Sequence, residues 1–149
     1  MNKVDYINEL VNKWDDRISW NDYFMSMAIL ASSRSPCHRL HVGCILVKNK
    51  RVISMGYNGF LPGAAHISRV RDNHEQSTVH AEQNAITDCS KRGVSSKHSI
   101  AYITHYPCIN CAKILIAGGI KIIYYKYNYK NDKLVKELLD DVGIMINKL

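Results

Sequence analysis

The sequence predicts a single α/β domain in which a mixed five-stranded sheet lies between two layers of helices. Residues 42–47 and 51–56 are β-rich and are separated by three residues suited to a tight turn, which predicts an antiparallel hairpin. Further along the chain, helical and strand-like patterns alternate, and a helix between successive strands favours a parallel crossover. At 149 residues the chain has the length of one ordinary domain, so we expect residues 1–149 to share one core.

The N-terminal half of the chain predicts one helix and one long loop around this hairpin. Ser19 followed by Asp22 resembles a capping box, and apolar residues then recur at helical spacing from Tyr23 to Ser33. Pro62–Val79 has no clear periodicity and contains Pro, Gly, Ser, His and charged residues. We therefore expect the first helix to begin after Ser19, and we expect Pro62–Val79 to form a loop of the kind that often carries function.

Three helices alternate with three strands in the rest of the chain. Gly93, Gly118 and Gly143 each follow a helical segment, where glycine commonly ends a helix, and Asp132 can cap the third segment. The expected helices are His80–Lys91, Cys108–Ala117 and Lys133–Asp141, and the expected strands are Ser99–Thr104, Ile120–Tyr125 and Ile144–Asn147.

The composition argues against a membrane or secreted protein and favours one that binds a metal. No apolar run approaches the roughly 18 residues that cross a membrane, and Met1–Trp14 lacks the apolar stretch of a signal peptide, so we expect a soluble cytoplasmic protein. In such a protein, five cysteines and seven histidines favour metal binding over disulfides. The net charge of +7 suits phosphorylated ligands, whereas the mixed charges of Lys121–Glu137 argue against a nucleic-acid surface.

Two short motifs predict a metal site. His80-Ala81-Glu82 and Pro107-Cys108-Ile109-Asn110-Cys111 each begin a predicted helix, and together they match the H-x-E and P-C-x-x-C signature of zinc deaminases. Ligation by His80, Cys108 and Cys111 leaves the fourth tetrahedral position of zinc for water, as in a catalytic site. A closed structural zinc site is the main alternative.

Glu82 is the candidate catalytic residue. It lies two residues from His80, close enough to reach the water without having to bind the metal. We expect it to accept a proton from that water, to protonate ring nitrogen 3 of the base, and to deliver a proton to the departing ammonia. The alternative is an ordinary acidic residue favoured by the dipole of a helix N-terminus.

Beyond these motifs, the chain from Trp20 to Ile146 resembles the deoxycytidylate deaminase family. This resemblance implies a three-layer α/β/α fold of the cytidine deaminase type and zinc-dependent conversion of dCMP to dUMP. The segments that carry it are Arg34-Ser35-Pro36-Cys37, Val42-Gly43, Gly56-Tyr57-Asn58-Gly59, His80 to Ile86, Tyr102-Ile103-Thr104 and Pro107-Cys108.

The same resemblance implies roles for residues outside the metal motif. Asn58 would bind the deoxyribose, Tyr129 would pack near the nucleotide, and Arg34 is the candidate for the phosphate. Their alternatives are a turn, a partly buried ring and a cation at a helix C-terminus. Further substrate-binding residues implied by the matching segments are Gly59, Ala81 and Thr104.

A second, structural zinc is the least certain implication of the family pattern. Cys37, His66 and His74 match ligand positions of family members that carry it. However, Ile67 stands where those members have a cysteine, so a fourth protein ligand is not evident.

Family resemblance also implies a homo-hexamer that is activated by dCTP and inhibited by dTTP. Three other functions compete with dCMP deamination: a tRNA adenosine deaminase, a nucleoside or dCTP deaminase, and a zinc module without activity. The Gly-Tyr-Asn-Gly segment disfavours the first, and the retained Glu82 disfavours the last.

Overall fold

The fold is built on one mixed sheet with the strand order β2-β1-β7-β8-β9. The computed structural model describes all 149 residues. β1 is antiparallel to both β2 and β7, whereas β7, β8 and β9 are mutually parallel, which confirms the predicted mixed five-stranded sheet. The strands are β1 (Gly43–Lys48), β2 (Arg51–Tyr57), β7 (Ile100–His105), β8 (Ile122–Tyr127) and β9 (Met145–Lys148).

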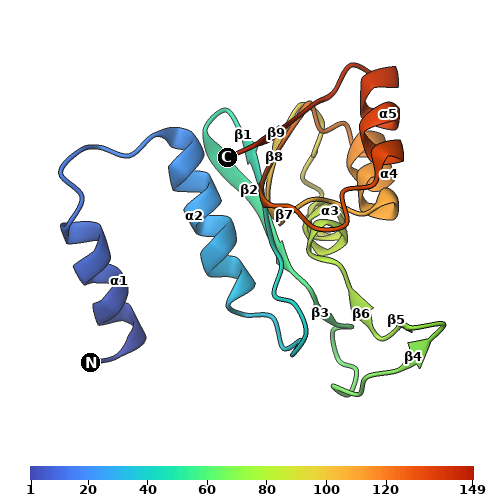
Figure 1. Cartoon of the computed structure of the whole chain (residues 1–149), viewed down its shortest axis with the longest axis horizontal. Coiled ribbons are helices and arrows are strands. Elements are labelled where there is room, and N and C mark those ends of the chain that lie inside the picture. Colours follow the sequence, from blue (N-terminus) through green and yellow to red (C-terminus); the bar gives the residue numbers. More distant parts are fainter.

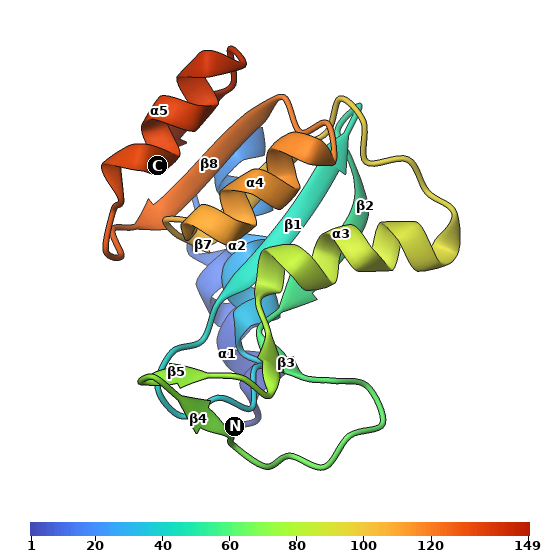
Figure 2. The same ribbon diagram turned by 90° about the vertical axis from the view of Figure 1, so that its right-hand side faces the viewer.

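Helices cover both faces of the sheet, as predicted (Figures 1 and 2). The helix α2 (Trp20–Ser32) begins after Ser19, whose hydroxyl caps it by accepting the N–H of Asp22. It packs on one face, and three helices lie on the other face. Those three are α3 (Ala81–Arg92), α4 (Ile109–Ala117) and α5 (Lys133–Asp141).

The two faces differ in the size of the core that they bury. The face under α3, α4 and α5 holds a cluster of 14 buried residues, many of them small, whereas the α2 face holds six, including Phe24 and Tyr102. Gly56 brings the first turn of α3 onto β2, because a Cβ there would lie 2.3 Å from the carbonyl oxygen of Ala81. The start of α3 is thus fixed against the sheet.

An additional helix at the N-terminus was not predicted. The helix α1 (Lys3–Asn12) is capped by Asn2, whose side-chain oxygen accepts the N–H groups of Val4 and Asp5 at 2.9 and 3.0 Å. None of its residues is buried, so it contributes nothing to the core. None of the helices combines the length and apolar character needed to cross a membrane.

The predicted loop Pro62–Val79 contains one short strand pair, and its last two residues pair with a short strand just before the loop. β3 (Gly59–Phe60) pairs with β6 (Thr78–Val79), and β4 (Val70–Arg71) pairs with β5 (His74–Glu75). Two-residue strands are too short to show a period of two, which is why the sequence predicted the loop but not these strands.

Candidate active site

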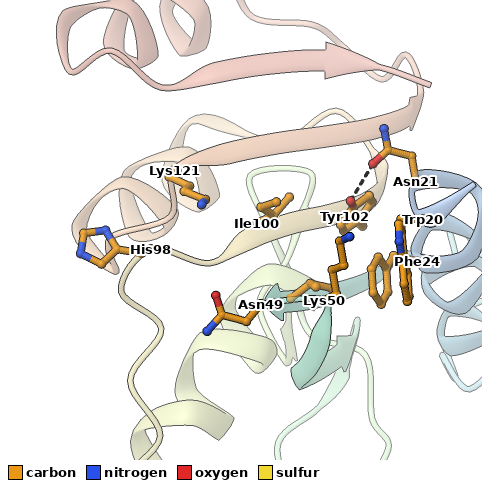
Figure 3. A pocket seen from close by; sticks show the side chains of 10 residues that line it. Trp20, Asn21, Phe24, Asn49, Lys50, His98, Ile100, Tyr102 and Lys121 are labelled. Carbon is orange, nitrogen blue, oxygen red and sulfur yellow. Dashed lines mark hydrogen bonds between the residues drawn. The ribbon is translucent and has the colours of Figure 1, made fainter.

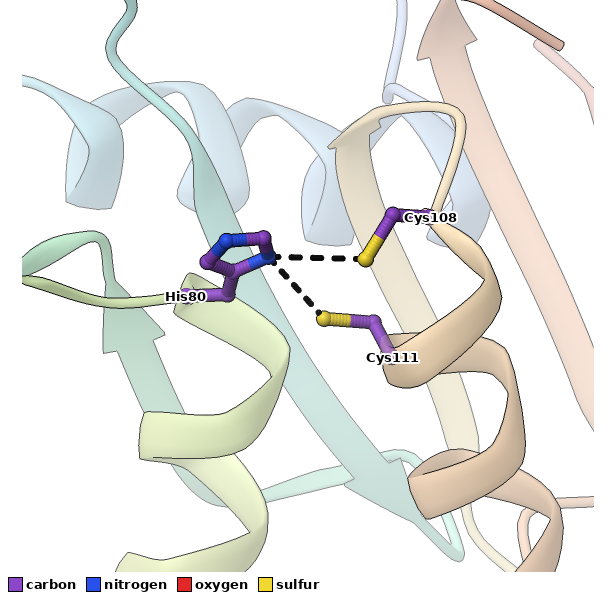
Figure 4. A group of neighbouring side chains, drawn as sticks. All are labelled: His80, Cys108 and Cys111. Atoms are coloured by element: carbon purple, nitrogen blue, oxygen red, sulfur yellow. Dashed lines mark hydrogen bonds between the residues drawn. The ribbon is translucent and has the colours of Figure 1, made fainter. Parts of the chain in front are cut away.

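The two metal motifs meet at the N-termini of α3 and α4. His80 is the N-cap of α3, Cys108 is the N-cap of α4, and Cys111 follows in the first turn of α4. The Nδ1 atom of His80 lies 3.3 Å from the sulfur of Cys111 and 3.6 Å from that of Cys108. Figure 4 shows the imidazole facing both thiols.

This geometry fits zinc. Metal–nitrogen and metal–sulfur bonds of roughly 2.0 and 2.3 Å in a tetrahedron place nitrogen and sulfur about 3.5 Å apart. The observed separations of 3.3 and 3.6 Å agree with that value. No other group of three His, Cys, Asp or Glu residues in the chain gathers its ligand atoms in this way. The three residues predicted as ligands therefore come together, and one tetrahedral position remains for water.

The thiols are prepared for metal binding by their surroundings. Hydrogen bonds from Cys111 and His80 lower the pKa of Cys108 to about 4, because both partners stabilise the thiolate. The same interaction with Cys108, together with burial, raises the pKa of Cys111. The hydrogen bond with Cys108 also raises the pKa of His80. A thiolate, which is the form that binds metal, is thus favoured at Cys108.

Glu82 lies in the first turn of α3 and is only 4% exposed. Burial raises the pKa of its carboxyl group, and this effect outweighs the opposing hydrogen bonds from its own backbone N–H and from Cys111. A carboxylate whose pKa is raised is a stronger base than an exposed one, which suits a group that has to take up and pass on a proton. Glu82 lines the same cavity as the metal ligands His80 and Cys108.

That cavity has a volume of about 850 Å³, within the usual range for small-molecule sites. The helix N-termini form one side of it. The other sides come from three irregular segments: residues 36–42, the loop between β3 and β6, and residues 129–130 after β8. A nucleotide-sized ligand could thus contact regular structure and loops at once.

Among the residues predicted to bind substrate, Asn58, Ala81 and Tyr129 line the cavity. The side chain of Asn58 also fixes the neighbouring segment, because its Oδ1 accepts the N–H of Val42 and its Nδ2 donates to the carbonyl of Leu40, both at 2.8 Å. Asn58 therefore shapes the cavity wall in addition to being exposed to it.

Gly59 and Thr104 do not line the cavity and act behind its wall. Gly59 pairs with Val79 in the short β3–β6 ladder. Thr104 is buried, its Oγ1 accepts the N–H of Gly43 at 3.1 Å, and it lies 2.8 Å from Nδ1 of His105. Thr104 therefore supports His105, which does line the cavity and whose pKa burial lowers.

The structure does not bring Arg34 to the cavity, and its role in binding phosphate stays a prediction. Arg34 is exposed at the end of α2 and is not part of the cavity wall. The arginine and lysine that do line it are Arg39 and Lys130. Arg39 lies between the two matching segments that carry the family resemblance, and Lys130 directly follows Tyr129. The only signal in the sequence for Arg39 and Lys130 is that each lies next to residues that carry the family resemblance.

The three residues predicted for a second zinc all line the cavity, but the structure does not gather them into a metal-binding group. The ring of His66 instead stacks on Phe60, with 4.9 Å between ring centres. His74 lies in β5, and Cys37 precedes the segment held by Asn58. The protein in this conformation therefore has one zinc-binding group.

A glutamate organises the loop that carries His66 and His74. The carboxylate of Glu75 accepts the N–H groups of Arg69 and Ser77 at 3.0 and 2.8 Å and the hydroxyl of Ser68. These bonds lower its pKa to about 2. Glu75 thus connects the residues before and after the β4–β5 hairpin through hydrogen bonds.

One imidazole and two thiols at two helix N-termini, with a buried carboxyl group beside them, define a zinc-dependent deaminase of nucleobases. The chain belongs to the cytidine and deoxycytidylate deaminase zinc-binding family, whose model matches residues 18–127.

Similarity to individual proteins supports this family assignment. The chain is 44% identical to ComE operon protein 2 of Bacillus subtilis over 90% of its own length and 73% of that protein. It is 34% identical to the deoxycytidylate deaminase of Schizosaccharomyces pombe over 94% of its own length but only 47% of that protein. The crystal structure of a cyanophage S-TIM5 dCMP deaminase with dCMP and dUMP superposes with a TM-score of 0.80 at 31% identity, covering 90% of this chain and 99% of that one.

Proposed function

We propose that this protein is a deoxycytidylate deaminase, which converts dCMP and water to dUMP and ammonia. The observation that carries the proposal is the buried Glu82 beside the His80, Cys108 and Cys111 group, in a cavity that also presents Arg39 and Lys130. Similarity to proteins named deoxycytidylate deaminase supports dCMP as the substrate.

Within this reaction the protein binds the base and moves protons. A bound zinc ion supplies the Lewis acidity that lets a water molecule add to the carbon bearing the amino group. Glu82 would accept one proton from that water and donate it to ring nitrogen 3; it would then take the second proton of the water, from the hydroxyl group now on the carbon, and transfer it to the amine, which departs as ammonia while the carbonyl forms. Its burial suits this role because burial raises the pKa of the carboxyl group, which makes the group a better proton acceptor.

The sugar and phosphate would be bound on the loop-derived side of the cavity. Arg39 and Lys130 are placed to pair with the phosphate, since charge-assisted hydrogen bonds to phosphate are among the strongest that proteins make. Tyr129, whose ring packs edge-on against His105 at 6.0 Å, offers a flat surface for the nucleotide. Asn58 would contact the deoxyribose through the part of its amide that is not bonded to the backbone.

The proposal includes a homo-hexamer regulated by dCTP and dTTP. Many large apolar side chains are exposed on the single chain, including Ile29 and Leu30 of α2 and Met55 of β2, and contacts between copies would cover such side chains. A solution mass of about 17 kDa would contradict assembly. Hyperbolic dCMP saturation that neither triphosphate changes would contradict regulation.

One assay separates the proposed reaction from its competitors. Ammonia release is measured in parallel on deoxycytidine, dCMP, dCTP and an adenosine-containing tRNA hairpin. We expect dCMP to have the highest kcat/KM, because a site built for sugar and phosphate leaves buried polar groups unpaired when either is missing. Preference for deoxycytidine, dCTP or the hairpin would overturn the substrate assignment, and absence of turnover on all four would favour the zinc module.

A further inference from the structure

A second cavity lies at the other end of the sheet, away from the zinc-binding group. Its volume is about 210 Å³, and its wall comes from the start of α2, the β1–β2 turn and the residues before β7 and β8 (Figure 3). β7 runs from Ile100 in this wall to His105 in the active-site cavity. Five steps along the strand place Ile100 roughly 17 Å from His105, and no residue lines both cavities.

The wall of this cavity contains two lysines and a histidine, and no acidic residue. The basic residues are Lys50, His98 and Lys121. Neither lysine forms a salt bridge anywhere in the chain. Asp22, in the first turn of α2, accepts the hydroxyl of Ser19 and is not part of the wall. The cavity therefore has unpaired positive charge and no internal counter-charge.

One hydrogen-bonded pair in the wall leaves an amide donor free. The hydroxyl of Tyr102 donates to Oδ1 of Asn21 at 2.7 Å, which uses the acceptor of that amide and leaves its N–H groups free to donate. Burial raises the pKa of Tyr102 to about 12, so the phenol keeps its proton at neutral pH. The ammonium group of Lys50 lies 5.2 Å from the ring centre of Trp20, which places the lysine at the cavity edge.

Two of the three basic residues of this wall have unfavourable backbone conformations. Lys50 and His98 have φ angles of 59° and 67°, in the left-handed region that favours glycine, and their neighbour Asn49 has 51°. These three account for half of the six non-glycine residues of the chain with positive φ. Non-glycine residues in this region cost about 1 kcal/mol each and often occur at functional sites.

We infer that this cavity is a binding site for a small phosphate-bearing anion, separate from the active site. Two unpaired ammonium groups, an imidazole and a free amide donor match the charge and hydrogen-bonding needs of phosphate oxygens. The volume corresponds to about seven water molecules, enough for a phosphate or diphosphate group. A larger ligand would extend past the exposed ring of Trp20 into solvent.

The two tryptophans of the chain allow a direct test. Trp14→Phe leaves Trp20, at the cavity edge, as the only tryptophan. In this background we expect pyrophosphate, titrated at constant ionic strength, to change the fluorescence saturably and to raise the Tm. The double variant Lys50→Ala/Lys121→Ala should weaken the apparent Kd at least about tenfold in both measurements. Lys113→Ala, on the opposite face of the sheet, is the matched control and should bind normally.

A parallel titration with ADP identifies the source of the anion. Tighter binding of ADP than of pyrophosphate indicates a nucleotide whose base contacts Trp20, whereas equal binding indicates recognition of the phosphates alone. Absence of a saturable change, or an equal response in the double variant, would overturn the inference. Because Lys50 and Lys121 lie outside the active site, turnover of dCMP by the double variant should be unchanged, which checks that it is folded.

Discussion

The active-site cavity has two sides that are built from different kinds of structure. On one side, His80, Glu82, Cys108 and Cys111 lie at the N-termini of two helices packed on the sheet. On the other side, Arg39, Lys130 and the His66–His74 segment lie on loops and two-residue strands. The first set is fixed by the core, whereas the second depends on local hydrogen bonds such as those of Asn58 and Glu75.

This difference suggests a division of tasks. Reacting groups need positions defined to a fraction of an ångström, and rigid elements provide that precision. Discrimination between nucleotides needs only a wall of the right shape and charge, which loops on a rigid scaffold supply. Substitutions on the helix side should therefore abolish chemistry, and substitutions on the loop side should produce graded losses that depend on the substrate.

The largest effect is expected at the metal ligands. Cys108→Ser or Cys111→Ser should remove both the zinc and the activity, because a hydroxyl group is a far weaker zinc ligand than a thiolate. Elemental analysis and ammonia release measure the two losses. Cys37→Ser is the control and should keep one zinc per chain, since Cys37 is not part of the metal-binding group. Wild-type protein that is active without zinc would contradict the assignment.

Glu82→Gln should retain zinc but lower kcat by at least about 100-fold, because the amide cannot move protons. Steady-state kinetics on dCMP together with a zinc determination test this expectation. Glu75→Gln serves as the control for a carboxylate in the same cavity and should keep kcat within a few-fold. Near-normal turnover by the Glu82 variant would remove this residue from the mechanism.

On the loop side, Asn58→Ala should reduce kcat/KM for dCMP by an amount equivalent to about 1 to 3 kcal/mol of transition-state stabilisation. The substitution removes the hydrogen bonds to Leu40 and Val42 and the polar group proposed to contact the deoxyribose. The zinc content should stay at one per chain, in contrast to the cysteine variants. An unchanged kcat/KM would show that neither the wall nor the sugar depends on this side chain.

Arg39 and Arg34 form a matched pair with the same charge and different placement. Arg39→Ala should lower kcat/KM for dCMP about tenfold and leave the value for deoxycytidine nearly unchanged, because the nucleoside has no phosphate to lose. Arg34→Ala should change neither value, since Arg34 lies outside the cavity. Equal losses on both substrates for Arg39→Ala would assign it a structural role, and a selective loss for Arg34→Ala would support the prediction for Arg34.

The smallest effect is expected at Glu75, and it should depend on pH. The folded state lowers the pKa of Glu75 from 4.5 to about 2, so its stabilisation of the loop is complete above pH 4.5 and is lost as the pH falls through about 2. Glu75→Gln should therefore speed hydrogen exchange at the amides of Arg69 and Ser77 at pH 7. The difference from wild type should shrink below pH 4.5. Glu137→Gln, on exposed α5, is the control.

The sequence by itself determined the elements with strong local signals. The capping residue Ser19, the hairpin turn, the helix-ending glycines and the alternating patterns predicted the five strands of the main sheet and four of the five helices, with boundaries shifted by at most two residues. The metal ligands could also be predicted, because the two motifs each occupy one helix N-terminus and their chemistry is specific. The helix α1 was missed although Asn2 and Asp5 form a capping box at its start, and none of its residues is buried.

Only the tertiary structure decided what the rest of the site contains. It placed Arg39 and Lys130, and not Arg34, in the cavity wall, and it directed His66 onto Phe60 instead of toward a second zinc. The physical reason is that loop side chains are positioned by hydrogen bonds between residues far apart in sequence, such as that from Asn58 to Leu40, and no local pattern records those partners.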